Sequence, residues 1–301
     1  MKSKLCTLCP RACATDRKER LGYCGAPDKI LVARAALHMW EEPPISGERG
    51  SGTIFFCGCN MGCVFCQNRD ISRPKTQVGR AFDAEGLWKI MLALREKGAH
   101  NINFVTPTHY ADVIADVLRT HKRELGIPVV YNCGGYESVD TLRALDGLVD
   151  IYLPDFKYFS PELSKKYSNA PDYAQIATVA LDEMLRQQSA CVFDENGIMQ
   201  KGVIVRHLVL PGCRKDSIEV LRKIAEIRND RDMRISLMRQ FTPDFLPEGD
   251  KFSSLRRRLT SFEYESVLNV ADELGFEGFS QGSSSATADF TPNFSDFFIE
   301  N

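Results

Sequence analysis

The chain has 301 residues, of which 44% are hydrophobic and 26% are charged. This balance is that of an ordinary globular protein, and it excludes a disordered chain, a coiled coil and a collagen-like fibre. With 38 basic and 40 acidic residues the net charge is -2, which gives no electrostatic case for a nucleic-acid partner. Because no apolar run approaches the ~18 residues of a membrane helix and the N-terminus lacks the apolar region of a signal peptide, we expect a cytoplasmic protein with no membrane partner.

Residues 1–50 carry many turn signals and little periodicity, apart from a short strand expected near 30–34. Four cysteines stand in this stretch, namely Cys6, Cys9, Cys13 and Cys24. We therefore interpret residues 1–50 as a small cysteine-rich, metal-binding module.

From residue 51 onward, apolar strand-like runs alternate with amphipathic helical segments. The predicted strands are 53–57, 101–106, 128–133, 150–155, 202–210 and 234–238. The predicted helices lie near 83–97, 109–124, 137–145, 171–189, 214–228 and 260–274. The last helix has a Thr260 or Ser261 cap and Glu263 just inside it. Six strand–helix alternations predict an α/β protein with a parallel sheet, either open and doubly wound or curled into a partial barrel, over residues 51–280.

Residues 281–301 form a linker-like tail that nevertheless carries several aromatic side chains. These are Phe290, Phe294, Phe297 and Phe298. Since a freely solvated tail rarely holds so many phenylalanines, we expect it to dock on its own domain or on a partner.

Eight of the 11 cysteines lie within the first 66 residues, which favours metal ligands over disulfides in a cytosolic chain. Cys59, Cys63 and Cys66 follow the first strand of the alternating region on one short loop. Three thiolates leave one iron of a cubane cluster without a protein ligand, whereas a structural zinc site or an electron-transfer cluster takes four ligands. Cys57 is a candidate fourth ligand, but it belongs to the strand, and we interpret it as a buried thiol.

The spacing Cys59-x3-Cys63-x2-Cys66, with Phe65 before the last cysteine, resembles the radical S-adenosylmethionine (radical SAM) superfamily. The resemblance implies a partial (β/α)6 TIM-like barrel in which the three cysteines hold a [4Fe–4S] cluster. It also implies that S-adenosylmethionine (SAM) chelates the open iron and that Phe65 lies against the adenine.

Further stretches are similar to a subgroup, the iron–sulfur proteins related to pyruvate formate-lyase activating enzyme (PflX-like). They are the N-terminal Cys-x-Leu-Cys-Pro-Arg-x-Cys, Val105-Thr-Pro-Thr-His109, Asn132-Cys-Gly-Gly135 and Leu153-Pro-Asp-Phe-Lys157. The chain departs from the activases proper in two places. Thr106-Pro-Thr-His109 replaces their Gly-Gly-Glu-like motif, and the four-cysteine module replaces the ferredoxin-like insert that some of them carry.

Polar side chains at strand ends are the candidate cofactor-binding residues. Alternation on the fourth strand places Ile151, Leu153, Asp155 and Lys157 on one face, with the charged pair at its C-terminal end. The resemblance implies that Asp155 and Lys157 approach SAM, although a salt bridge at the sheet rim explains them as well. The other candidates are Thr106, Thr108, Asn132 and Arg206.

Each of these candidates has a structural alternative. Thr108 also suits a helix cap, and the glycines after Asn132 also suit a tight turn. Arg206 suits a carboxylate of SAM or substrate because its fork is bidentate, and His207 then points to the opposite face as a packing residue. The four N-terminal cysteines suit either tetrahedral zinc or a second iron–sulfur cluster.

The resemblance implies an oxidoreductase that cleaves SAM reductively to a 5′-deoxyadenosyl radical, which abstracts hydrogen from a protein or peptide, including the case of a glycyl radical enzyme. Its electron donor would be a flavodoxin or a ferredoxin. Two alternatives stay open: radical modification of a small molecule or a peptide, and a non-catalytic iron–sulfur electron carrier. A site for a protein loop should be wide at the strand ends, whereas a small-molecule site should be closed by the tail. An electron carrier needs a fourth cysteine, so Cys57→Ser would destroy its cluster.

Overall fold

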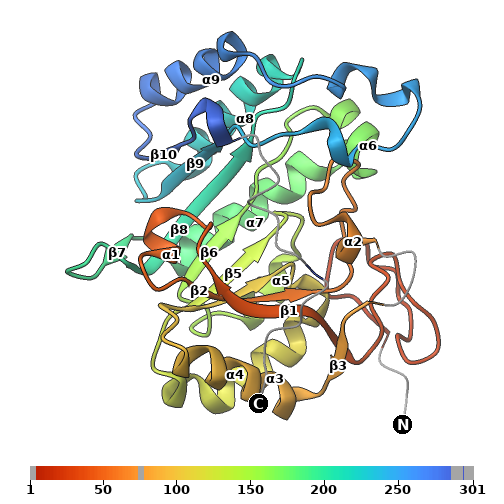
Figure 1. The fold of residues 1–301 in the computed structure, drawn as a ribbon, viewed down its shortest axis with the longest axis vertical. Coiled ribbons are helices and arrows are strands. Elements are labelled where there is room, and N and C mark those ends of the chain that lie inside the picture. The colour runs from red at the N-terminus through yellow and green to blue at the C-terminus, as the bar shows by residue number, and fades with distance from the viewer. Residues whose placement is uncertain (1–4, 74–77, 286–293, 295–301) are drawn as a thin grey trace.

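The computed structural model describes residues 5–73, 78–285 and 294 (Figure 1). Its strands are β1 (Ile30–His38), β2 (Ser51–Phe56), β3 (Arg80–Phe82), β4 (Ile102–Val105), β5 (Val129–Cys133), β6 (Ile151–Pro154), β7 (Val192–Phe193), β8 (Met199–Leu208), β9 (Arg234–Met238) and β10 (Gly278–Ser280). Its α-helices are α1 (Pro43–Ser46), α2 (Arg69–Ser72), α3 (Ala84–Glu96), α4 (Ala111–Leu125), α5 (Val139–Ala144), α6 (Pro161–Ser168), α7 (Tyr173–Gln187), α8 (Arg214–Arg228) and α9 (Ser261–Glu273). Short 3-10 helices cover Thr108–Tyr110, Pro243–Phe245, Asp250–Leu255 and Ser283–Ser285.

One sheet organises the fold, in the order β10-β9-β8-β6-β5-β4-β2-β1-β3, with β7 paired to β8 alone. Neighbouring strands from β2 to β10 run parallel, and β1 pairs antiparallel with β2 and β3. Six of the parallel strands are each followed by a helix, which confirms the predicted (β/α)6 alternation, and β10 adds one more parallel strand. Within the described residues β10 and β3 are the two edge strands and do not pair with each other. The curled sheet is therefore not closed and forms a partial barrel.

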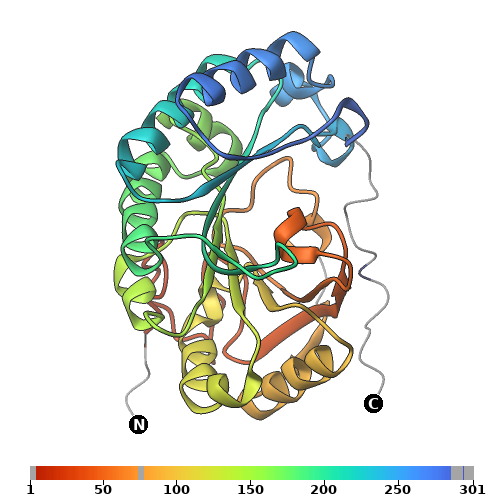
Figure 2. The same cartoon turned by 90° about the vertical axis from the view of Figure 1, so that its left-hand side faces the viewer.

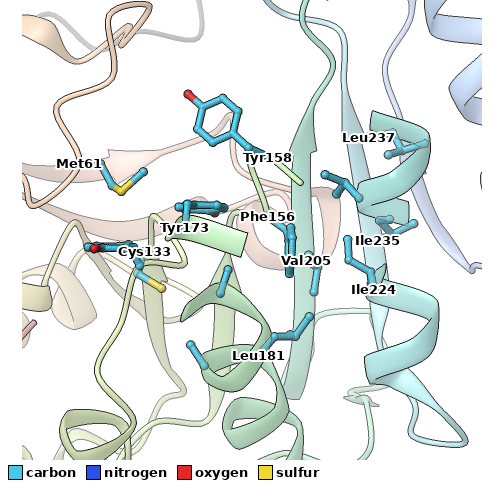
Figure 3. Close-up of a cluster of buried hydrophobic side chains, with 14 of the residues drawn as sticks. Met61, Cys133, Phe156, Tyr158, Tyr173, Leu181, Val205, Ile224, Ile235 and Leu237 are labelled. Atoms are coloured by element: carbon cyan, nitrogen blue, oxygen red, sulfur yellow. The ribbon is translucent and has the colours of Figure 1, made fainter. Parts of the chain in front are cut away.

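The predicted helices cover the outer face of the sheet, where they form an arc (Figure 2). Local sequence explains their ends. Gly126 adopts the left-handed conformation that ends α4, and Thr260 and Glu263 form the expected capping box at the start of α9. The outer core buries aromatic and aliphatic side chains from strands and helices together, including Phe156, Val205 and Leu181 (Figure 3).

The inner face is filled at its N-terminal end by the short helix α1, the orange helix inside the arc of Figure 2. Ile45 of α1 packs against alternate residues of three neighbouring strands, among them Val130, Ile151 and Leu153. Ile204 belongs to the same group, whereas Val203 and Val205 face the outer helices. The period of two predicted for these strands is therefore confirmed.

The strand β1 extends further than the short strand predicted near 30–34, and it belongs to the main sheet. The sheet thus begins before residue 50, where the sequence suggested a boundary between a module and the barrel. That domain division stays a prediction. Among the described residues, no helix combines the length and the apolar character needed to cross a bilayer.

Candidate functional site

The cluster loop, residues 58–68, connects β2 to α2 and carries Cys59, Cys63 and Cys66. Glycines set its path, because Gly58 and Gly62 have φ angles of 91° and 63° that side chains rarely adopt. A Cβ on Gly58 would lie 2.8 Å from the carbonyl oxygen of Cys24. The loop therefore passes directly over the N-terminal cysteine-rich segment.

The three thiols of the loop line one cavity of about 210 Å³ at the C-terminal ends of the parallel strands. Burial raises the pKa of Cys66 to about 12, and the neighbouring Cys59 and Cys63 add to this effect. Burial and Cys63 likewise raise the pKa of Cys59. Three thiolates held this closely need a positively charged partner, and that donor set fits an iron–sulfur cluster.

Within the described part of the chain, no three His, Cys, Asp or Glu side chains are arranged to hold a single metal ion. A cubane cluster does not require such an arrangement, because it places each cysteine sulfur on a different iron. The donor set of the cluster loop is compatible with that group.

Cys57 lies outside this set. Its side chain is buried, and Sγ donates to the carbonyl oxygen of Val78 at 3.3 Å. It packs in an apolar group with Leu31 and Ile71, and it does not line the cavity. The placement agrees with the interpretation of Cys57 as a buried thiol.

The four N-terminal cysteines lie close to one another and against the cluster loop. The carbonyl oxygen of Cys24 accepts a hydrogen bond from the Cys59 amide at 3.0 Å. Burial raises the pKa of Cys9 to about 12, with smaller contributions from Cys24 and Cys6, and burial also raises the pKa of Cys24. Cys13 influences Cys24 in the same way, so the four thiols share one neighbourhood. A metal site there, zinc or iron–sulfur, stays a prediction.

Five polar side chains form a network at the bottom of the cavity, which we call the floor network. They are Glu41, Asn132, Asp155, Lys157 and Arg206. Arg206 lies at the centre: Nε donates to Asp155 at 3.0 Å, Nη1 donates to Glu41 at 3.3 Å, and Nη2 donates to Asn132. Lys157 donates to the second oxygen of Asp155. The sequence-predicted Asn132, Asp155, Lys157 and Arg206 thus converge on one place.

The pKa values of the two carboxyl groups in the network shift in opposite directions. Burial alone would raise the pKa of Asp155, but the cations Arg206 and Lys157 outweigh it and lower that pKa. Burial raises the pKa of Glu41 despite the opposing charge of Arg206. Each of the three guanidinium nitrogens of Arg206 donates a hydrogen bond to a side-chain oxygen of the floor network. The guanidinium group is therefore held in place by the protein itself.

Glu41 is the member of the floor network that the sequence analysis did not predict. It precedes α1, and with α1 it lies inside the curled sheet, where its side chain is 8% exposed. The adjacent Glu42 is also buried, and one of its oxygens has no hydrogen-bond partner. An acidic pair before two prolines gives no local signal of burial, because such residues usually face solvent.

The remaining predicted residues divide between the cavity and the protein behind it. Phe65 lines the cavity and packs edge-on against Tyr158, Tyr167 and Phe241. Thr106 lines it as well. Its φ of 58° is an outlier for a β-branched residue, of the kind that clusters at functional sites.

Thr108 instead lies 1% exposed behind the strand end, where its hydroxyl donates to Glu137 at 2.8 Å. A cofactor role for Thr108 stays a prediction. Burial raises the pKa of Glu137 to about 8. On β8, His207 faces away from the cavity and its Nδ1 bonds the carbonyl oxygen of Phe156 at 2.6 Å, as the predicted alternation with Arg206 requires.

A second hollow of about 590 Å³, the side cavity, continues from the first along the open edge of the sheet. The two share Trp40, Glu41, Arg206, Met238 and Gln240, and the side cavity reaches β10. A larger hollow of about 730 Å³ lies between the starts of α6, α8 and α9, away from the cysteines of the cluster loop.

Comparison with known proteins identifies a family whose model covers the cluster loop. The family model described as the radical SAM superfamily matches residues 53–182, which include the cluster loop and the strand ends from β4 to β6. The uncharacterized protein MJ0674 of Methanocaldococcus jannaschii is 30% identical over 286 residues, which cover 91% of this chain and 76% of that protein.

Solved structures align with this chain at low identity. SuiB of Streptococcus suis, bound to S-adenosylmethionine, aligns with a TM-score of 0.50 and 14% identity over 77% of this chain. The chain spans 50% of the length of SuiB. A domain of pyruvate-formate lyase-activating enzyme from Bacteroides vulgatus aligns with a TM-score of 0.40 and 12% identity, covering 57% of this chain and 92% of that domain.

Proposed function

Since the chain belongs to the radical SAM superfamily, we propose that it is an enzyme that cleaves S-adenosylmethionine at a [4Fe–4S] cluster held by Cys59, Cys63 and Cys66. The cluster and SAM, when bound, supply a 5′-deoxyadenosyl radical that abstracts hydrogen from substrate. The observation that carries the proposal is the convergence of three cysteine thiols and a charged floor network on one cavity.

The residues of the chain hold and shield the reactants. The thiols of the cluster loop provide three ligands, and Phe65 offers an apolar wall for a flat ring. We assign Asn132, Asp155, Lys157 and Thr106 to contacts with SAM, because their polar atoms lie at the strand ends that border the cavity. Arg206 holds Asp155 and Asn132 in place, which fixes the directions of their remaining acceptors and donors.

The test is anaerobic. The protein is reconstituted with iron and sulfide, reduced and given SAM, and 5′-deoxyadenosine is quantified. We expect production by the wild type and by Cys57→Ser, whose thiol lies outside the cavity, and none by Cys63→Ala. Loss of the cluster in Cys57→Ser would instead support an electron carrier with four cysteine ligands. A fully loaded wild type that never cleaves SAM, even with cell extract as a source of substrate, would contradict the proposal.

We propose a protein or peptide as the substrate, with activation of a glycyl radical enzyme as its narrower form. The side cavity supports this, because it leads from the floor network to the edge of β10 with which no other described strand pairs, and Gly278 and Ser280 of β10 are exposed. A free strand edge can pair with an extended peptide. The reductant would be a flavodoxin or a ferredoxin.

A small-molecule substrate is the second candidate, and one contact favours it. Phe294, from the predicted tail, packs edge-on against Phe55 with ring centroids 5.5 Å apart, and Phe55 lines the cavity. This contact brings part of the tail to the site. Phe290, Phe297 and Phe298 lie outside the described residues.

Deuterium transfer distinguishes the two candidates. A lysate from cells grown in deuterated medium is split by ultrafiltration into macromolecules and small molecules, and each fraction is added to the reduced enzyme with SAM. Deuterium in 5′-deoxyadenosine from the macromolecular fraction alone would support a protein or peptide. Deuterium from the small-molecule fraction alone would support the second candidate.

A further inference from the structure

The sulfur of Cys63 accepts a hydrogen bond from a residue distant in the sequence. Ser168, the last residue of α6, places its hydroxyl oxygen 2.9 Å from Cys63 Sγ. The Tyr158 hydroxyl lies 2.7 Å from the same Ser168 oxygen. Both side chains are almost fully buried, with Ser168 at 2% and Tyr158 at 1% exposure. In Figure 3, Tyr158 lies above Tyr173 and on the same side of the core as Met61 of the cluster loop.

The protons available to this chain of hydroxyl groups determine which group donates in each of the two hydrogen bonds. A cysteine that ligates metal is a thiolate, which accepts hydrogen bonds and has no proton to donate. Ser168 must then give its single proton to Cys63. The proton between the two hydroxyl groups consequently belongs to Tyr158, so the chain runs from Tyr158 to Ser168 to Cys63. Such aligned donors strengthen one another in a site of low dielectric.

Backbone contacts hold Ser168 at this place. The amide of Val64, next to Cys63, donates to the carbonyl oxygen of Tyr167 at 2.9 Å. The guanidinium group of Arg11 joins α6 to the cluster loop, because Nη2 donates to the Ser168 carbonyl at 3.2 Å and Nε donates to the Asn60 carbonyl at 2.9 Å. Arg11 is itself stacked over the ring of Tyr23 at 3.9 Å. The backbone at Ser168 is therefore held by two other segments, the cluster loop and the N-terminal segment.

The hydrogen bonds to the sulfurs of Cys59 and Cys66 are longer. Met61 gives its amide to Cys59 Sγ at 3.3 Å, and the Ser72 hydroxyl lies 3.5 Å from Cys66 Sγ. Among these three donors, Ser168 makes the shortest contact, and it has a second hydroxyl group behind it.

We propose that the relay from Tyr158 through Ser168 to Cys63 raises the reduction potential of the cluster and so makes its reduction by the electron donor easier. Hydrogen bonds to cysteine sulfurs are one of the factors that set the potential of an iron–sulfur cluster. Reduction adds negative charge to the cluster and its sulfurs, so a donor stabilises the reduced state more than the oxidised state. The inference rests on the proposed function, because it requires the cluster at Cys59, Cys63 and Cys66.

The experiment measures the midpoint potential of the reconstituted cluster by anaerobic potentiometry, with the reduced state followed by electron paramagnetic resonance. Ser168→Ala removes the donor to sulfur, and Tyr158→Phe removes only the second hydroxyl and keeps the packing. Ser164→Ala is the matched control. Ser164 is equally buried in the same helix, but its hydroxyl bonds the Pro161 carbonyl at 3.1 Å.

We expect Ser168→Ala to lower the reduction equilibrium constant about tenfold, which is a negative shift of about 59 mV for a one-electron couple. Tyr158→Phe should shift the potential in the same direction by less, and Ser164→Ala should leave it unchanged. Unchanged potentials in both Ser168→Ala and Tyr158→Phe, with wild-type iron and sulfide content, would overturn the inference. Failure of the wild type to assemble a cluster would overturn the proposed function instead, so the two failures are distinguishable.

Discussion

Replacing Arg206 by methionine tests whether the floor network stabilises the fold as well as the site. The guanidinium group binds Asp155, Glu41 and Asn132, and its side chain is only 15% exposed. Methionine keeps much of the apolar stem and removes the charge and every one of these hydrogen bonds. The variant therefore leaves two buried carboxylates with less compensation, and Glu41 loses the cation that binds it.

The magnitude follows from the geometry. Breaking a buried ion pair by removing one partner costs about 3–5 kcal/mol, because the remaining charge stays desolvated. Asp155 keeps Lys157 as a second cation, so we expect a loss in the free energy of unfolding near the lower end, about 3 kcal/mol. That is a large fraction of the roughly 5–15 kcal/mol that stabilises a typical protein.

The loss should depend on pH in a defined direction. Burial raises the pKa of Glu41, and removal of Arg206 takes away the charge that opposes this rise. A carboxyl with a raised pKa binds more protons in the folded state than in the unfolded state, so stability falls as the pH rises above the unfolded pKa. The deficit of Arg206→Met against the wild type should accordingly be smaller near about pH 5 than near about pH 8.

The assay is anaerobic urea denaturation of the metal-free protein, followed by circular dichroism at both pH values. Arg222→Met is the control, because it removes an arginine that is 60% exposed and pairs with Glu219 on the surface of α8. It should cost less than about 1 kcal/mol. Adding Glu41→Gln to Arg206→Met should recover part of the loss. A deficit below about 1 kcal/mol that does not change with pH would refute this reasoning about the floor network.

Three further predictions address separate features. Glu263→Gln should cost about 1 kcal/mol at neutral pH, because the neutral amide still suits the capping box of α9 but loses the charge that pairs with Arg257. The bond from Arg257 lowers the pKa of Glu263, so the stability it provides is present above the unfolded pKa and should fade as urea denaturation is repeated at falling pH. Thr106→Gly should raise the thermal unfolding midpoint if the left-handed conformation of Thr106 stores strain, and an unchanged or lower midpoint would argue against strain. Serine at all four N-terminal cysteine positions should leave a folded protein that binds one metal set fewer, and unchanged metal content would contradict a second site.

The sheet was predictable because its signals are local. Each parallel strand is a short apolar run, and the alternation along β6 and β8 separates Asp155 and Arg206 on the inner face from His207 on the outer face. Once the strands are parallel and in register, their C-terminal ends meet, so the polar residues that follow them must be neighbours. These two facts bring four members of the floor network together, whereas the approach of Asp155 and Lys157 to SAM was implied by the family resemblance.

Most of the missed features depend on contacts between distant segments. The antiparallel pairing of β1 and the position of α1 inside the curled sheet are set by tertiary packing, which the local pattern of residues 39–50 does not encode. Glu41 is buried for that reason alone. The helix α6 was not predicted either, since its eight residues are mostly polar.

The cysteine spacing therefore specifies the proposed ligands of the cluster and leaves their surroundings to the rest of the fold. Ser168 comes from α6, Arg11 from the N-terminal segment, and the carbonyl that binds Cys59 belongs to Cys24. None of the three lies within the cluster loop. Two proteins with the same cysteine motif will consequently differ in cluster potential where they differ in a distant donor to sulfur such as Ser168, because potential depends on hydrogen bonds to sulfur as well as on the ligands themselves. In this chain the N-terminal segment contributes to that environment through Arg11 and Cys24, whether or not its own thiols hold a metal.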